Sequence, residues 1–306
     1  MVDRFEYLRN ILVRLSIPTE CHELVLAAYQ KISKEDIEYV LCAYEDENVE
    51  FCAMLNNWQY INSRYKIRPF LGDLLFSLLM CQKLEELYEK KGYSKEMFIR
   101  TATGISYTVI ECHLIKKEWG TFVAWWFDDF FRLRRFGFGR LQFELTHFGY
   151  TYINHGKVFT PTTRCLFLHI PRTGERLYPK EVDASIKEAL AFFRPMFNNK
   201  PIIIKCESWV LFSKTIEFLD KDSNLYKFAK RFNIFKQKEF DNISDMWRLF
   251  DDEVYVSDPN QFEAGGIIKQ IIELGKLKAD TSLRRRYLEY LKQGGKIGEG
   301  VGFFIA

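Results

Sequence analysis

The sequence predicts an α+β protein with a helical N-terminal domain and a mixed-sheet C-terminal domain. Apolar residues recur at helical spacing from the start of the chain to about residue 136, and from Gly137 onward they alternate with period two. Further along, short apolar strands alternate with amphipathic helices. A chain of 306 residues is long enough to form two cores. We therefore expect a helical domain at 1–136 and a sheet domain at 137–306.

The N-terminal domain contains several helix signals. Ser33, with an acidic residue three positions later, forms a capping box that opens a helix over 34–44. A long helix is expected to begin at Pro69 and to end near Gly92, and Ser94 is expected to cap the next helix. A last helix is expected over about 115–135. The first helix of the chain is marked by apolar residues on one face, which are Phe5, Leu8, Ile11, Leu12 and Leu15.

The C-terminal domain begins with a strand at 139–147, in which Leu141, Phe143 and Leu145 point to one side. Polar residues occupy the other side, so the strand is expected to be half-buried. The later elements follow in order: a hairpin at 150–160 with its turn at 154–156, a central strand at 164–170, a helix from Pro179, a strand at 201–211, a helix at 282–292 and a closing edge strand at 300–305.

Composition excludes several classes of protein. Hydrophobic residues make up 47% and charged residues 28%, as in ordinary soluble globular proteins. A net charge of +3 is too small for a dedicated nucleic-acid binder, although aromatic and basic residues interleave at 130–140 and 226–238. Seven cysteines without a CxxC pair indicate reduced thiols and no metal site. With no signal peptide and no apolar run long enough to span a bilayer, we expect a cytoplasmic protein without a membrane partner.

A candidate phosphate-binding loop lies between the strand at 164–170 and the helix from Pro179. Backbone N–H groups at a helix N-terminus attract anions, and a glycine such as Gly174 allows close approach of a phosphate. Arg172 and Arg176 can clamp phosphate oxygens. The alternative is an ordinary strand-to-helix connection with solvated arginines.

Two residues are candidate bases. Glu144 lies on the polar side of its strand, where partial burial would raise its pKa toward neutrality. The alternative is a solvent-facing carboxylate. His169 ends an apolar strand next to the loop, where a neutral imidazole can take a proton from an attacking amine. The alternative is a histidine that is hydrogen-bonded for structural reasons.

Cys206 and Ser208 share one face of the strand at 201–211. If this strand lies beside the one that carries His169, Cys206 could form a thiolate–imidazolium pair with it and act as a nucleophile. The alternative is an inert core cysteine. Ser208 is a candidate proton donor.

Several short blocks resemble a bacterial family of acyltransferase-domain proteins. They are Gly139-Arg-Leu-Gln-Phe-Glu144, Leu168-His-Ile-Pro-Arg-Thr-Gly174, Cys206-Glu-Ser-Trp-Val-Leu211, Asp280-Thr-Ser-Leu-Arg284 and Gly294-Gly-Lys296. The resemblance covers nearly the whole chain. It implies an N-acyltransferase N-terminal domain followed by a GNAT-like C-terminal domain.

The resemblance also implies a reaction and a cosubstrate. GNAT enzymes bind acyl-CoA between two splayed central strands and transfer the acyl group directly to an amine. Here acetyl-CoA or another acyl-CoA would be held at Ile170, Arg172, Thr173, Gly174, Glu175 and Arg176, and the acceptor would be an amine of a small molecule or peptide. The usual GNAT loop has Gln or Arg where this chain has Pro171, and a small residue where it has Arg176. This departure leaves open a second hypothesis, a catalytically inactive GNAT-like scaffold that binds a peptide or small ligand.

Overall fold

The computed structural model describes residues 3–45, 49–154, 156–240, 247–251 and 274–306. The chain forms two compact units, Met1–Glu144 with His169–Glu175, and Leu145–Leu168 with Arg176–Ala306. We call them the helical unit and the sheet unit and describe each by itself. In the parts of the chain described, no helix is both long enough and apolar enough to cross a membrane.

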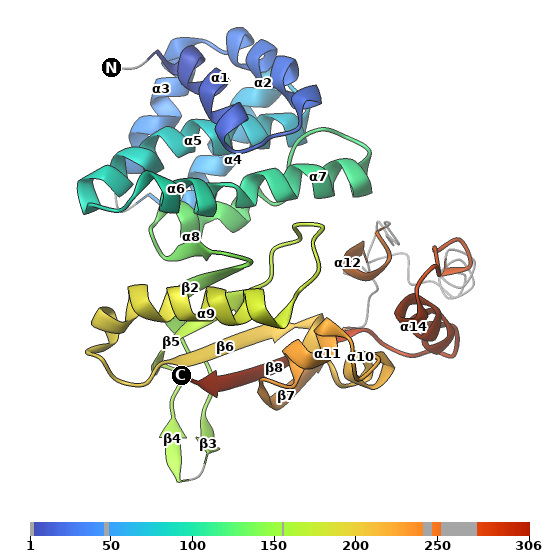
Figure 1. Ribbon diagram of the computed structural model, residues 1–306. Helices are drawn as coiled ribbons and strands as arrows, with labels where there is room; N and C mark the ends of the chain where they lie inside the picture. Colours follow the sequence, from blue (N-terminus) through green and yellow to red (C-terminus); the bar gives the residue numbers. More distant parts are fainter. Residues whose placement is uncertain (1–2, 46–48, 155, 241–246, 252–273) are drawn as a thin grey trace. The chain divides into compact units, whose positions relative to one another are not determined.

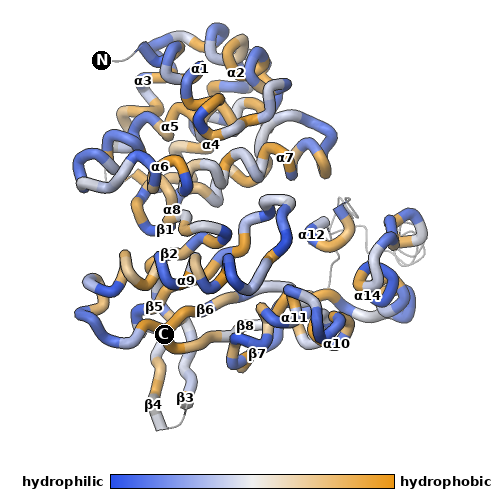
Figure 2. Tube along the Cα trace, in the orientation of Figure 1, coloured by the Kyte–Doolittle hydropathy of each residue, from blue (hydrophilic) through white to orange (hydrophobic). Residues whose placement is uncertain are grey.

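The helical unit is built around α5 (Pro69–Lys91), whose middle is buried on all sides (Figure 1). An all-round apolar surface is typical of a helix at the centre of a core, and Figure 2 shows hydrophobic stretches along it. The other helices of this unit are α1 (Arg4–Arg14), α2 (Thr19–Lys31), α3 (Lys34–Cys42), α4 (Phe51–Arg64), α6 (Lys95–Ala102), α7 (Gly104–Lys116) and α8 (Asp128–Phe131), with short 3-10 turns at Ala43–Glu45 and Ala124–Phe127.

The expected helix boundaries in this unit are confirmed at three places. The Ser33 hydroxyl accepts a hydrogen bond from the Asp36 N–H at 3.1 Å, so α3 begins at the predicted cap. The Ser94 hydroxyl caps α6 in the same way through the Met97 N–H at 3.1 Å. Gly92 ends α5 with a φ of 71°, in the left-handed region that favours glycine.

The predicted helix at 115–135 is wrong. The first helix of this region, α7, ends at Lys116. Thr121 N–H then donates to the Phe70 carbonyl at 2.9 Å, and the Gly120 backbone lies so close to that peptide that a Cβ atom would overlap it. The chain therefore leaves helical geometry, and only the short α8 forms before a strand begins at Arg135. The apolar residues whose helical spacing predicted this helix, among them Trp119, Phe122 and Trp126, therefore do not share one helix face.

A buried carboxyl group lies within the helical core. Asp73 on α5 is 7% exposed, and its two carboxylate oxygens each accept from Gln59 Nε2 at 3.1 Å. Burial raises the pKa of Asp73 to about 6, against the opposing effect of the Gln59 hydrogen bonds. Because the folded state holds the proton more tightly than the unfolded chain does, ionised Asp73 costs stability, and this cost grows as the pH rises from about 4 to above 6.

Replacing Asp73 by asparagine is expected to stabilise the protein by about 2–3 kcal/mol at pH 8. The amide keeps the shape of the side chain and avoids burial of a charge, so the gain should shrink as the pH falls to 4. Urea unfolding at several pH values measures this difference. Glu96→Gln, at an exposed position of α6, is the control and should have little effect at either pH. A gain in stability that does not depend on pH would contradict the raised pKa of buried Asp73.

The central sheet has the strand order β1-β2-β5-β6-β8-β7. Strands β5 and β6 pair in parallel, whereas the β1–β2, β6–β8 and β7–β8 pairs are antiparallel, so the sheet is mixed and the α+β prediction is confirmed. The strands are β1 (Arg135–Phe138), β2 (Leu141–His147), β5 (Arg164–His169), β6 (Ile203–Ser208), β7 (Asn233–Glu239) and β8 (Gly298–Ile305). The position of β5 between β2 and β6 agrees with the central strand expected at 164–170.

Parallel strands need a crossover, and α9 (Pro179–Phe193) supplies it between β5 and β6. Figure 1 draws α9 alongside β6, while the β3–β4 hairpin (Tyr152–Asn154 and Lys157–Phe159) projects from the sheet. Residue 155 in the predicted hairpin turn lies outside the described residues. The strand expected at 201–211 ends at Ser208 and continues as a 3-10 turn, Trp209–Leu211. The remaining helices are α10 (Ser213–Phe218), α11 (Asn224–Ala229), α12 (Trp247–Phe250) and α14 (Ser282–Lys292), the last as predicted.

The closing strand was predicted at an edge of the sheet, and this is wrong. The last strand, β8, lies between β6 and β7 and pairs with both along most of its length. A Cβ atom at Gly300 would overlap the carbonyl of Leu211, so the glycine lets β8 pass close to the 3-10 turn that follows β6. A strand at the end of the chain can thus be internal when its partners come from earlier segments.

A polar cluster lies on the sheet unit around Lys205, which is 6% exposed. Its ammonium donates to the Phe148 carbonyl at 3.1 Å and pairs with Glu207 at 3.2 Å. Glu207 also accepts from Lys238 at 2.8 Å. Each buried charge in this cluster has a partner of opposite charge, which is the condition for tolerating it inside a sheet.

Candidate active site

Two candidate bases predicted from the sequence lie in direct contact within the helical unit. His169 is the last residue of β5, and Glu144 lies near the middle of β2. His169 Nε2 lies 2.9 Å from Glu144 Oε2, which is hydrogen-bond distance. The two side chains are 9% and 13% exposed. A carboxylate that holds an imidazole in this way fixes its orientation and stabilises the imidazolium that forms when it takes a proton.

Glu144 is also held by Arg135, whose side chain is only 3% exposed. Strands β1 and β2 are antiparallel and place Arg135 directly opposite Glu144. The guanidinium donates to Glu144 Oε2 from Nη2 at 2.8 Å and from Nε at 3.2 Å. Glu144 Oε2 therefore contacts both Arg135 and His169. Both partners are cations when the imidazole is protonated, and only Arg135 is a cation when the imidazole is neutral.

The Trp126 indole packs against both partners of Glu144. Its ring lies 4.4 Å from the Arg135 guanidinium carbon, a cation–π distance. The centroid of its ring lies 5.3 Å from that of His169, and the two planes are nearly perpendicular at 86°. The imidazole is thus oriented by a carboxylate and confined by an aromatic ring.

This geometry corrects the expected role of Glu144. Burial alone would raise the pKa of Glu144, as expected from the sequence, but the hydrogen bond from His169 and the charges of His169 and Arg135 lower it to about 2. The carboxylate is neither solvent-facing nor a base of near-neutral pKa. A group with so low a proton affinity is a poor general base at pH 7.

The loop after His169 has one glycine in the left-handed region. Gly174 has a φ of 81°, and there is open space where a Cβ atom would be. Arg140 holds the two ends of the loop, because its guanidinium donates to the carbonyls of Pro171 at 2.7 Å and Glu175 at 3.3 Å. Arg176 is exposed. The loop then leads into α9, whose N-terminus has no side-chain cap.

The loop uses some of its amides internally. Thr173 N–H donates to the Pro171 carbonyl at 3.1 Å, and Glu175 N–H donates to the Thr173 hydroxyl at 3.1 Å. These two N–H groups already donate hydrogen bonds within the loop, so they are not available to a phosphate. In the described part of the chain, no acceptor lies at the amides of Gly174, Arg176 and Leu177.

The hypothesis of a cysteine nucleophile is not supported. Cys206 is 1% exposed within β6, and burial raises the pKa of its thiol well above the usual range. A thiolate–imidazolium pair requires the opposite shift. On the same face, the Ser208 hydroxyl accepts a hydrogen bond from Val210 N–H at 3.2 Å and so caps the 3-10 turn that follows β6.

Replacing Cys206 by alanine is therefore expected to leave turnover within about twofold of wild type, although the small cavity should cost about 1 kcal/mol of stability. Initial rates and thermal unfolding of the same preparation separate these two effects. Loss of turnover in a variant that stays folded would restore the covalent hypothesis.

A comparison with known families matches residues 135–304 to the GNAT-like C-terminal domain. The match spans more than half of the chain and starts at β1. The chain belongs to this family.

Solved structures with the same fold also cover nearly the whole chain. An acyltransferase in complex with decanoyl-CoA and teicoplanin is 21% identical, with a TM-score of 0.71 over 97% of this chain and 87% of the other. An acyltransferase mutant in complex with octanoyl-CoA is 19% identical, with a TM-score of 0.72 over 97% and 87%. At this level of identity the likeness shows the fold. No curated protein sequence matches the chain.

In the GNAT-like domain, the parallel pairing of β5 with β6 is short. The two strands pair at Leu166↔Ile204 and Phe167↔Lys205, and among the described residues the pairing does not continue to Leu168 and Cys206. A short ladder that ends partway along two neighbouring strands agrees with the splayed pair expected for this family.

Arg135 and Trp126 were not among the predicted site residues, because the apolar spacing of the sequence predicted a helix over both. A signal was present. Gly139 and Arg140 form a two-residue loop between Phe138 and Leu141, and Gly139 has a φ of 53° as such hairpin loops require. Extending the hairpin backwards from this loop places position 135 opposite position 144.

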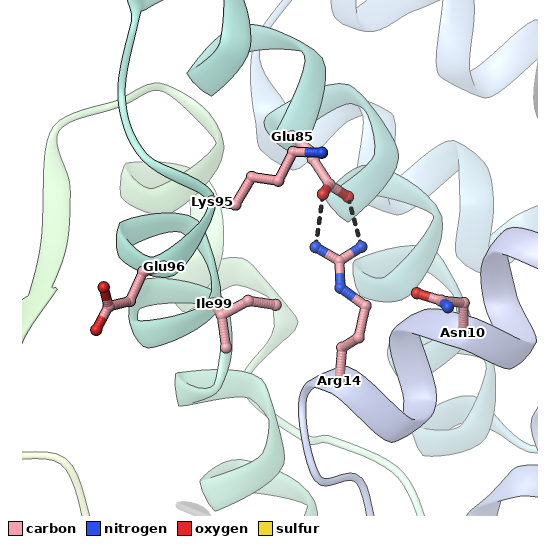
Figure 3. Close-up of a pocket in the computed structure, with 6 residues that line it drawn as sticks. All are labelled: Asn10, Arg14, Glu85, Lys95, Glu96 and Ile99. Carbon is pink, nitrogen blue, oxygen red and sulfur yellow. Dashed lines mark hydrogen bonds and ion pairs between the residues drawn. The ribbon is translucent and has the colours of Figure 1, made fainter.

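A separate pocket of about 480 Å³ lies between α1, α5 and α6 of the helical unit (Figure 3). Figure 3 shows Arg14 and Glu85 pointing toward one another, and their bidentate contacts measure 2.5 and 2.9 Å. Glu85 accepts in addition from the Tyr7 hydroxyl at 3.0 Å. The central charges of this pocket neutralise each other. None of the predicted site residues lines it.

No group of three or more His, Cys, Asp or Glu side chains is arranged to hold a metal ion among the residues described.

Proposed function

We propose that the protein transfers an acyl group from acyl-CoA to an amine of a small molecule or peptide. The observation that carries the proposal is the buried His169–Glu144 pair, because His169 lies directly before the loop that contains Gly174. The GNAT-like fold supports it, since the solved acyltransferases of this fold hold decanoyl-CoA, octanoyl-CoA or CoA.

In this proposal His169 is the general base. An amine reaches the site as an ammonium ion, and His169 takes one proton from it. Because Nε2 faces Glu144, the proton goes to Nδ1. Glu144 stays ionised and stabilises the imidazolium. The amine nitrogen then attacks the thioester carbonyl and a C–N bond forms. As the C–S bond breaks, the second proton of the amine replaces the proton that Ser208, the candidate donor, gives to the leaving thiolate, so that the amide and the CoA thiol are released and His169 returns its proton to solvent.

The loop and the start of α9 are the proposed phosphate site. The amides of Gly174, Arg176 and Leu177 would donate to the diphosphate of the cosubstrate, and Arg172 and Arg176 would add charge. Ile170, Thr173 and Glu175 would shape the loop. Arg176, where the family pattern has a small residue, would contact the phosphate through its exposed guanidinium rather than through close backbone approach.

The amine acceptor and the length of the acyl chain are identified by assaying a panel of substrates. Two of the solved acyltransferases hold teicoplanin or 10C-teicoplanin, so teicoplanin is a reasonable first acceptor, followed by a panel of primary amines and peptides. Acetyl-, octanoyl- and decanoyl-CoA cover short and medium chains.

Thermal unfolding with each acyl-CoA tests binding, and release of free thiol in the presence of amines tests turnover. At about 100 times Kd, binding adds roughly 2.7 kcal/mol of stability, which gives a clear rise in melting temperature. Gly174→Ala should reduce that rise because it places a side chain at a left-handed position in the loop. Gly156→Ala, with a similar φ of 77° and equally open space, is the matched control and should leave it unchanged.

No rise with any acyl-CoA would contradict the proposal. That outcome would support the non-catalytic scaffold for a peptide or small ligand, which the altered residues Pro171 and Arg176 and the hydrogen-bonded loop amides favour. A rise without thiol release from any acceptor would show a protein that binds acyl-CoA but does not transfer its acyl group to the amines tested.

A further inference from the structure

The His169–Glu144 pair belongs to a larger buried charge cluster, which we define as Asp129, Arg135, Glu144 and His169. Arg135 lies between the two carboxylates. Its Nη2 donates to Asp129 Oδ2 at 2.6 Å and to Glu144 Oε2 at 2.8 Å, and its Nη1 donates to the Trp126 carbonyl at 3.1 Å. Three acceptors, two from residues 126–129 and one from β2, hold the guanidinium in one orientation.

The outer end of the cluster reaches solvent. Asp129 on α8 is 23% exposed and also accepts from Arg134 Nε at 2.7 Å. Arg134 is 46% exposed and contacts Asp128 as well, at 2.8 Å. Solvent screens this outer pair, so its influence on the buried end is weak. Arg135, which is almost completely buried, is not screened in this way.

The charges of the cluster differ between the two states of His169. With a neutral imidazole, the two carboxylates and one guanidinium sum to −1. With an imidazolium, the sum is zero. Removing the guanidinium would leave two carboxylates and favour the imidazolium. Removing the Asp129 carboxylate would leave the positive charge of Arg135 less compensated and would favour the neutral ring.

We propose that Arg135 and Asp129 are positioning residues that act on His169 through Glu144, and that their opposed charges tune how readily the imidazole binds and releases a proton. Arg135 offsets the charge of Glu144, so that the imidazole can return to its neutral form after each transfer. Asp129 offsets Arg135, so that the imidazole is still basic enough to accept the proton. This inference rests on the proposed function of His169 as a base.

The packing supports the same coupling. The Trp126 segment accepts from Arg135 through its carbonyl and contacts His169 through its ring. The orientation of the guanidinium, the indole and the imidazole is therefore shared, and a change at Arg135 reaches His169 by contact as well as by charge.

The test is the titration of the histidine side chains by ¹H–¹⁵N NMR, which requires no turnover. The chain has five histidines, and His169→Gln identifies the His169 signal. Arg135→Met should move the titration of His169 upward by about one pH unit, and Asp129→Asn should move it downward by a similar amount. Arg135→Lys keeps the positive charge but loses the planar guanidinium that donates to both carboxylates. Its titration should therefore shift upward by less than that of Arg135→Met. The acidic limb of the kcat profile should move in the same directions, with little change in the KM for acyl-CoA.

Arg134→Met is the matched control, because it removes a guanidinium one residue away that contacts Asp129 and not Glu144. Its shift should stay below about 0.3 pH unit. If Arg135→Met does not fold, Asp129→Asn and Arg135→Lys decide the outcome. No shift in Asp129→Asn, or a shift in the same direction as that of the arginine variants, overturns the inference. Opposed shifts in a protein without transferase activity would support the inference and refute the proposed function instead.

Discussion

Replacing His169 by glutamine is expected to lower the rate of acyl transfer by about 10²–10⁴-fold, the usual contribution of a positioned general base. The glutamine amide can still donate to Glu144, but it cannot take a proton from an ammonium ion at neutral pH. Binding of acyl-CoA should be unchanged, because the loop amides do not depend on the imidazole. Rates of thiol release and calorimetric titration with CoA measure these two quantities separately.

The matched control is His147→Gln. His147 ends the neighbouring strand β2, and its side chain is exposed. The same chemical change there should leave both turnover and binding as in wild type. If His169→Gln kept full turnover, the imidazole would not be the base, and the proposed mechanism would be wrong even if acyl-CoA still bound.

Replacing Glu144 by glutamine is the second large expected effect. The amide nitrogen of glutamine can donate to His169 Nε2, which would favour the tautomer that carries its proton on Nδ1, where the amine has to deliver one. It would also remove the charge that stabilises the imidazolium. In a serine-protease triad the equivalent change costs about 10⁴ in kcat, and a loss of about 10²–10⁴ is expected here. The pH dependence of kcat is the informative measurement, because no increase of pH should restore the lost imidazolium stabilisation.

The same substitution has a stability effect with a defined pH range. The pKa of Glu144 is depressed to about 2 in the folded protein from a usual value near 4.5. A depressed pKa means that the ionised group stabilises the fold above about pH 4.5, and that this contribution, on the order of 3 kcal/mol, is lost as the pH falls toward 2. In Glu144→Gln, the decline of stability over this range should be shallower than in wild type.

Glu207→Gln is the control for this second variant. Glu207 is 16% exposed and pairs with Lys205 and Lys238, so it resembles Glu144 in burial and pairing but contacts no histidine. Its replacement should destabilise the protein and leave turnover intact. If Glu207→Gln abolished turnover while Glu144→Gln did not, the assignment of the His169–Glu144 pair as the catalytic pair would be wrong.

Local sequence signals were sufficient for most single elements. Capping by Ser33 and Ser94, termination at Gly92 and the alternation that marks β2 each depend on neighbouring residues only, so the pattern carries the information. The helix predicted at 115–135 failed for the complementary reason. There the apolar period fits a helix, but the backbone of Gly120 and Thr121 is held by the carbonyl of Phe70, about fifty residues earlier in the chain. The spacing of apolar residues within one segment carries no information about a close contact with a distant segment.

By itself, the sequence determined the fold class, the strand–loop–helix unit with Gly174, and the identity of His169 and Glu144 as the residues of interest, because these follow from local pattern and side-chain chemistry. Only the tertiary structure decided that the two side chains touch, that Arg135 and Trp126 complete their surroundings, and that Cys206 lies in the core. The physical reason is that proton affinity depends on charge and burial in three dimensions. The cationic partners of a carboxylate, and the water excluded from it, come from strands that only folding brings together.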